Sequence, residues 1–328
     1  MLSYTLSISS HLYFSSTPLP KKIQGFVFCV MYSLIIGSSW NWNVLDKAQI
    51  QMINTCLDFE VKILQGEEKL KTSVQTKGMF VFFHILKHNY YLIPLAVLGL
   101  ILIDPCTPPF LLSMSTNCSA IRWNGWVILI PLIETYICAC FFYIGIVAIV
   151  YNLFAGISSL MSYFQLLERK ILTATSLTGC ESCISKYRMI QLVEKIMNAF
   201  SMEQVVPSIV CGIPLLQIVL QYVIITMHGE IAMPVFLMFP ATLFNAVVNN
   251  MLIFTLASWV YNSSVKVLRK LDMTILQYTR KSVIRKQWKS CGRLKIKFGS
   301  NFIDGGTPLV IQNFCLNQTM SLILIKEG

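Results

Sequence analysis

Charged residues are scarce in this chain. Only 12% of its 328 residues are Asp, Glu, Lys or Arg, which is about half the fraction found in a typical soluble domain. Apolar residues make up 55%, and the mean hydropathy is +0.63. Because long apolar runs recur along most of the chain, the composition excludes an ordinary soluble protein and predicts one that crosses the lipid bilayer several times.

Catalytic signatures are absent as well. The sequence contains no GxSxG, HExxH, P-loop, GxGxxG or EF-hand pattern. His84 and His88 have the i, i+4 spacing that can chelate a metal, but no third ligand lies nearby in the sequence. Cys180 and Cys183 form a lone CxxC, and the eleven cysteines together lack the spacing of a disulfide scaffold. We therefore expect no enzymatic activity, no metal site and no cofactor.

Six apolar segments predict an all-α bundle of transmembrane helices. They cover residues 23–44, 79–103, 126–151, 205–227, 234–261 and 309–325. The first could also be read as a cleaved signal peptide, although its long start and flanking tryptophans favour a span. The predicted organisation is an irregular segment 1–22, a bundle 23–260 with helical cytoplasmic loops 45–78 and 151–204, a basic segment 261–308 and a last helix 309–328.

Basic residues outnumber acidic ones by 26 to 15, but they lie between the apolar runs. They therefore indicate loops that face the cytoplasm and anionic lipid, and not nucleic-acid binding. The loops 45–78, 151–204 and 261–307 hold 21 Lys and Arg residues, whereas the alternate loops and ends hold four. Positive charge stays in the cytoplasm, so the C-terminus is predicted to lie outside. The glycosylation sequon at Asn117 is then external too.

Polar residues inside apolar segments are costly to bury, so they point to function or to helix–helix contacts. Glu134 is interpreted either as part of a ligand pocket, with Trp126 and Tyr136, or as a carboxyl group bonded to a neighbouring helix. The pairs Gln217/Gln221 and Asn245/Asn249 are predicted to bind neighbouring helices.

In the last segment a stripe at four-residue spacing predicts a helix that lines water or packs in a bundle core. The stripe consists of Asn313, Asn317 and Ser321. Thr307 and Pro308 are predicted to begin this helix, with Thr307 as its N-cap.

Several segments resemble the odorant and gustatory chemoreceptors of arthropods. Residues 54–60 are similar to the cytoplasmic helix of that family, and residues 294–302 with Thr307-Pro308-Leu309 are similar to its anchor region and pore-helix entry. The gustatory signature is reduced here to Thr319 and four apolar positions. The resemblance implies seven helices with a cytoplasmic N-terminus, so we expect that one further span precedes this sequence or that the chain is divergent.

The resemblance also implies a function. It predicts a multi-pass chemoreceptor of the plasma membrane that assembles as a homo- or hetero-tetramer with related subunits. A small apolar odorant or tastant would open it as a cation channel lined by Asn313, Asn317 and Ser321. The expected ligand pocket lies in the outer half and consists of Trp126, Glu134, Tyr136, Phe236, Phe239 and Phe244. A G-protein-coupled receptor and a small-solute transporter are the alternatives. Against the first, the cytoplasmic end of the third span lacks an Asp-Arg-Tyr-like triplet. Against the second, transporters usually have internal repeats, and none is seen in this sequence.

Overall fold

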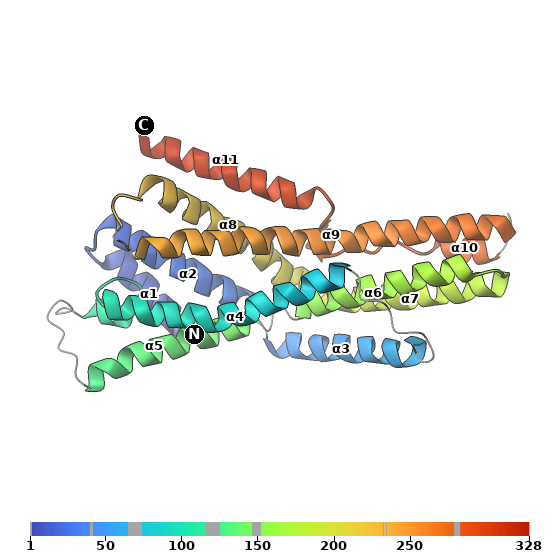
Figure 1. Ribbon diagram of the computed structural model, residues 1–328, viewed down its shortest axis with the longest axis horizontal. Helices are drawn as coiled ribbons and strands as arrows, with labels where there is room; N and C mark the ends of the chain where they lie inside the picture. The colour runs from blue at the N-terminus through green and yellow to red at the C-terminus, as the bar shows by residue number, and fades with distance from the viewer. Residues whose placement is uncertain are drawn as a thin grey trace.

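The computed structural model describes residues 2–39, 42–64, 74–115, 125–145, 152–231, 233, 235–278 and 283–327. It is an elongated bundle built almost entirely of helices, as predicted (Figure 1). The apolar helices gather toward one end of the molecule. The other end contains α6, α7, α10 and the last part of α9.

The helices and strands follow one another along the chain with short connections. They are α1 (Leu2–Phe14), α2 (Leu19–Ser39), α3 (Trp42–Leu64), α4 (Val74–Ile103), η1 (Leu111–Met114), α5 (Gly125–Gly145), α6 (Asn152–Thr173), α7 (Leu177–Phe200), the π-helical turn η4 (Ser201–Val205), α8 (Val206–Thr226), η5 (Val235–Leu237), α9 (Met238–Tyr278), α10 (Val283–Lys289), β1 (Lys297–Phe298), β2 (Asn301–Phe302) and α11 (Thr307–Glu327).

Five of the helical segments in the described part of the chain are long and apolar enough to cross a bilayer. They are Leu19–Gly37, Val127–Gly145, Ser201–Thr226, Val235–Gln277 and Thr307–Lys326. The sixth predicted span corresponds to α4, whose apolar stretch, Tyr90–Ile103, is shorter. The predicted multi-pass bundle is therefore confirmed, with one span weaker than expected.

The N-terminal segment differs from the prediction. Residues 1–22 were expected to be irregular, but residues 2–14 form α1, which packs against α2. Ile8 and Leu12 are buried on one face, with Thr5 beside them. This spacing of three to four residues is helical. The many serines concealed it, because serine favours caps and turns in isolated sequence.

Glycines allow the apolar helices to approach one another closely. A Cβ atom at Gly212 of α8 would lie 2.3 Å from Cδ1 of Leu34 in α2, and one at Gly25 of α2 would lie 2.5 Å from Cδ2 of Leu12 in α1. Small residues at such contacts are typical of membrane helices, where close van der Waals packing replaces the hydrophobic effect as the main attraction. Thus α2 is held between α1 and α8.

The connection after α4 agrees with the side of the membrane predicted from the basic residues. Cys106 in this connection is disulfide-bonded, and disulfides form in oxidising compartments and not in the cytoplasm. Asp104 accepts a hydrogen bond from Nζ of Lys21 at 3.1 Å. This ion pair explains how a lysine at the start of the first span is accommodated on the same side.

The chain between α10 and α11 is held by side chains of α7 and α9. The Tyr187 hydroxyl lies 2.8 Å from Oγ of Ser264 and donates to the Gly292 carbonyl at 2.9 Å. Nδ2 of Asn198 donates to the Lys295 carbonyl at 2.8 Å and to Glu194 at 2.6 Å. Antiparallel strands β1 and β2 then lead into α11. This region is the basic segment predicted at 261–308.

The start of α11 at Thr307 is as predicted, but its cap is not. Asp304 supplies the capping carboxylate: its Oδ1 accepts hydrogen bonds from the backbone N–H of Gly306 at 3.0 Å and of Thr307 at 2.9 Å. The Thr307 hydroxyl accepts from the Asp304 N–H at 3.0 Å. The two side chains therefore cap each other's backbone, in the manner of a capping box.

Candidate functional site

The last helix, α11, lies along one side of the molecule and packs against α8 and α9 (Figure 1). Pro308, Cys315 and Thr319 are buried in this contact. Nearly all other positions of the helix are half-buried or exposed, including the apolar residues Leu316 and Met320. A single narrow face therefore attaches α11 to the rest of the chain.

Four amides and one hydroxyl group hold this face in place. We call them the α11 clasp, and they are Gln217, Gln221, Asn250, Gln312 and Thr319. Nε2 of Gln217 donates to Oε1 of Gln312 at 2.8 Å, and Nε2 of Gln312 donates back at 3.3 Å. Asn250 donates to Gln217 at 3.2 Å, and Thr319 donates to Gln221 at 2.8 Å. The predicted role of the Gln217/Gln221 pair as a link between helices is confirmed.

Of the second predicted pair, Asn249 donates to the Asn245 carbonyl one turn earlier in its own helix. The neighbour Asn250, which sequence reasoning missed, makes the contact between helices instead. No periodic signal distinguishes Asn250 from Asn249. Only the rotation of α9 against α8 decides which of the two adjacent amides is buried.

The predicted pore-lining residues, here called the amide stripe (Asn313, Asn317 and Ser321), are all exposed. At about 100° per residue, Asn317 lies about 160° around the helix from buried Cys315. The amide stripe is therefore on the face opposite the one that packs on α8 and α9. Oγ of Ser321 donates to the Asn317 carbonyl at 2.9 Å, while the amide groups themselves point away from the chain.

The second polar site is a carboxyl group buried among aromatic rings. Glu134 of α5 is 2% exposed, and its Oε1 accepts hydrogen bonds from the Leu111 N–H at 2.6 Å and from the Tyr4 hydroxyl at 3.2 Å. The rings of Tyr32 and Phe141 are stacked at 4.3 Å beside it, and the Tyr4 ring centroid lies 5.9 Å from that of Tyr32. We call these residues the Glu134 cluster.

The structure brings only part of the predicted ligand pocket together. Tyr136 is 70% exposed, because two residues along a helix from Glu134 it points to nearly the opposite side. Phe244 is 71% exposed, five residues after fully buried Phe239. In the single chain these two rings therefore lie on the outer surface, apart from Glu134. The side chain of Trp126, like all of Asn117, lies outside the described residues.

Phe236 and Phe239 do lie together, with ring centroids 6.5 Å apart. They belong to a hydrophobic cluster of α2, α8 and α9, whereas the Glu134 cluster belongs to the core of α1, α2, α4 and α5. Val235 and Met238, at the start of α9, nevertheless pack against that second core. The two groups of aromatic residues are therefore on different sides of α2, and the first turn of α9 lies near both.

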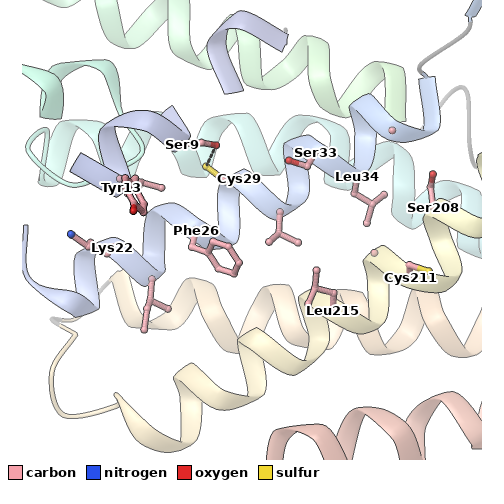
Figure 2. Close-up of a pocket in the computed structure, with 15 residues that line it drawn as sticks. Ser9, Tyr13, Lys22, Phe26, Cys29, Ser33, Leu34, Ser208, Cys211 and Leu215 are labelled. Carbon is pink, nitrogen blue, oxygen red and sulfur yellow. Dashed lines mark hydrogen bonds between the residues drawn. The ribbon is translucent and has the colours of Figure 1, made fainter. Parts of the chain in front are cut away.

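An open groove runs between α2 and α8, with α1 at one end, and has a volume of about 760 Å³. Figure 2 shows Lys22 and Tyr13 at one end, Ser208 and Cys211 at the other, and Phe26 between them. This volume is typical of small-molecule sites. None of the predicted ligand residues lines the groove, so it is distinct from the Glu134 cluster.

The structure describes the positions of the histidine and cysteine motifs found in the sequence. The His84 and His88 rings are 4.7 Å apart and exposed, and no group of three or more possible ligands occurs among the described residues. Cys180 and Cys183 are buried free thiols in the core that α3, α6, α7 and α9 form. Burial raises the pKa of both, which is typical of unreactive structural cysteines.

No protein-family model and no curated protein sequence matches the chain. Among solved structures, it is similar to the insect olfactory receptor OR5 from Machilis hrabei, determined in complex with eugenol. The TM-score is 0.58 at 11% sequence identity, over 99% of this chain and 86% of the other. The chain has the insect olfactory receptor fold. The expected resemblance to arthropod chemoreceptors is thereby confirmed at the level of the fold, and the likeness is to a receptor and not to an enzyme.

The olfactory receptor fold extends over almost the whole chain, because the match covers 99% of it. The amide stripe, the α11 clasp and the Glu134 cluster therefore all lie within the shared architecture. Tyr4, in the segment expected to be irregular, is the contributor to the cluster that sequence reasoning missed. The helical spacing of Thr5, Ile8 and Leu12 was the signal that would have placed it on a helix.

Proposed function

We propose that the protein is a chemosensory receptor of the plasma membrane that opens a cation channel when a small apolar molecule binds. The observation that carries the proposal is the position of the amide stripe on α11. This helix is long and apolar enough to cross the bilayer, yet it presents Asn313, Asn317 and Ser321 away from the chain. Amides facing lipid would lack hydrogen-bond partners, so this face needs water or another polar surface.

A ring of identical chains satisfies this requirement. If copies assemble around an axis next to α11, each amide stripe faces a shared water-filled path, and side-chain amides suit a weakly selective passage for cations. The apolar residues Leu316 and Met320 on one flank and Phe314 on the other would then pack against neighbouring copies. Cyclic assembly buries the same patch on every subunit. We propose four subunits, as the family resemblance implies.

The proposed ligand site lies in the outer half of the bundle, at the Glu134 cluster. The Glu134 cluster combines aromatic walls with one fixed polar group, which is the usual composition of a small-molecule site. Trp126, Phe236 and Phe239 remain further candidates, although the two phenylalanines lie on the other side of α2. The similarity to a receptor that was solved with eugenol supports an aromatic ligand of this size. The site and the amide stripe are on different helices, so binding must favour the open arrangement to act on the pore.

Thiol modification tests the pore. We would express the full chain in cultured cells, evoke currents with eugenol, and apply a charged thiol reagent from outside to Asn317→Cys. We expect the reagent to reduce the current at least severalfold in the variant. The wild-type chain is the control, because its native cysteines, including exposed Cys211, report any unrelated effect. Ligand-evoked current that the reagent leaves unchanged in Asn317→Cys would contradict the assignment of the amide stripe to the pore.

A further inference from the structure

Glu134 has an unused acceptor. Both of its hydrogen bonds, from Tyr4 and from the Leu111 N–H, go to Oε1, and the buried Oε2 has no hydrogen-bond partner within the described part of the chain. Leaving a carboxylate oxygen unpaired at 2% exposure is costly, so such groups usually have a functional reason or an additional bound molecule. The Leu111 bond of 2.6 Å also orients the carboxyl group before anything else binds.

The surroundings define the kind of molecule that fits. The rings of Tyr32 and Phe141 are stacked on each other and are 3% and 0% exposed, and with Tyr4 they make the surroundings of the carboxyl group aromatic. A small aromatic ring that carries a hydroxyl group would meet both features at once. A neutral hydroxyl is also less costly to bring into an apolar site than an ammonium group. The hydroxyl group of such a ring can donate a hydrogen bond to the carboxyl oxygen that has no partner among the described residues.

A phenol of the chain itself already makes this kind of contact, at the other carboxyl oxygen, Oε1. The Tyr4 ring lies 5.9 Å from Tyr32 and 6.4 Å from Phe141, and its hydroxyl reaches Glu134. Tyr4 is only partly buried, in contrast to the rings it contacts. It belongs to α1, a helix of 13 residues that packs chiefly on α2. Of the residues around the carboxyl group, Tyr4 is therefore the one that can leave with the least disturbance to the core.

We propose that Glu134 recognises the hydroxyl group of a small phenolic ligand, and that Tyr4 bonds this carboxyl group as an internal substitute until the ligand displaces it. The inference rests on the proposed receptor function and names its ligand class. It also connects the site to the rest of the molecule, since Val235 and Met238 at the start of α9 pack against the same core. Exchange of Tyr4 for a ligand thus changes the surface on which α9 begins.

Binding to the purified full-length protein tests the proposal without requiring a current. The probes are eugenol, which is a phenol, and its O-methyl ether, which has the same ring but no donor. The readout is the concentration that gives half-maximal thermal stabilisation. We expect the wild-type protein to prefer the phenol by about tenfold, the ratio that corresponds to one favourable hydrogen bond. In Glu134→Gln, which replaces one acceptor oxygen by an amide donor, this preference should largely disappear.

Tyr4→Phe tests the internal substitute separately. Because the variant removes the hydrogen bond that any ligand must break, it should strengthen binding of both probes by a similar factor, about three- to tenfold. Tyr91→Phe is the control, since Tyr91 of α4 is 62% exposed and does not line the groove between α2 and α8, so its change should leave both affinities unaltered. Equal affinity of the wild-type protein for phenol and ether overturns the proposal, as does a Tyr4→Phe variant that binds no more tightly.

Currents separate this inference from the proposed function. Selective stabilisation by the phenol in a protein that conducts no ion supports the Glu134 site and contradicts the channel. Equal currents evoked by phenol and ether support the channel and contradict the Glu134 site. If Glu134→Gln does not fold, the wild-type comparison and Tyr4→Phe still decide the outcome.

Discussion

Gln217 is the residue on which the attachment of α11 depends most. It is fully buried in α8, and its side-chain amide exchanges hydrogen bonds with Gln312 while accepting one from Asn250. Gln217→Leu keeps a similar size but leaves two donors unpaired inside the bundle. We expect a loss of about 1–3 kcal/mol in the free energy of unfolding. Denaturation of the purified protein measures it, with exposed Gln318→Leu as the control. An equal loss in both variants would contradict the clasp.

Glu194 is a buried carboxyl group of α7. Burial raises its pKa above the ordinary value of 4.5, although it accepts a hydrogen bond from the Lys295 N–H and is bonded to Asn198. The folded chain therefore retains a proton that the unfolded chain releases, so stability falls as the pH rises from 4.5 through the raised pKa.

The variant Glu194→Gln has no proton to lose, so its unfolding midpoint should be less dependent on pH in this range. A series of denaturation curves at increasing pH makes the comparison. Glu181→Gln, on the exposed face of the same helix, should behave as the wild-type protein does. If the wild-type slope persists in Glu194→Gln, another group is responsible for it.

At the scale of single elements, apolar length and spacing predicted most of what the structure contains. The spans became α2, α5, α8, α9 and α11, because an apolar run of this length has few alternatives to a helix. What could not be predicted was the side of each helix that faces inward. Glu134 and Tyr136, or Phe239 and Phe244, have equivalent apolar neighbours in the sequence. Their burial depends on how α5 and α9 rotate against the other helices, which only long-range packing determines.

Asp304 caps the start of α11, so its replacement should affect the whole first turn of the helix. Its carboxylate accepts two backbone N–H groups that no residue within the helix can satisfy. Asp304→Ala should cost about 0.5–2 kcal/mol and increase the hydrogen exchange of the amides of residues 306–310. Asp304→Asn, which keeps an acceptor, should cost less. Unchanged exchange in Asp304→Ala would show that the strands β1 and β2 hold the helix start by themselves.

For the whole molecule, the decisive property is its orientation in the membrane. The basic loops and the disulfide at Cys106 both predict that the connection after α4 lies outside and that α11 ends on the same side. An epitope tag after Gly328 should be stained on intact cells, whereas a tag inserted between α6 and α7 should be stained only after permeabilisation. If Asn117 carries a glycan, glycosidase treatment should increase the gel mobility of the wild-type protein and leave that of Asn117→Gln unchanged. A C-terminal tag that is hidden on intact cells would exclude the channel and favour a G-protein-coupled receptor.

The length of α9 has a mechanical consequence. Its 41 residues form one uninterrupted helix with no glycine, and its one proline, Pro240, lies in the first turn. At about 1.5 Å per residue it extends about 60 Å, roughly twice the thickness of the hydrocarbon layer. A stiff rod of this length acts as a lever: a tilt of about 5° at one end displaces the other by about 5 Å. A movement of the first turn of α9 would therefore displace the end of the helix that contacts α7 and α10.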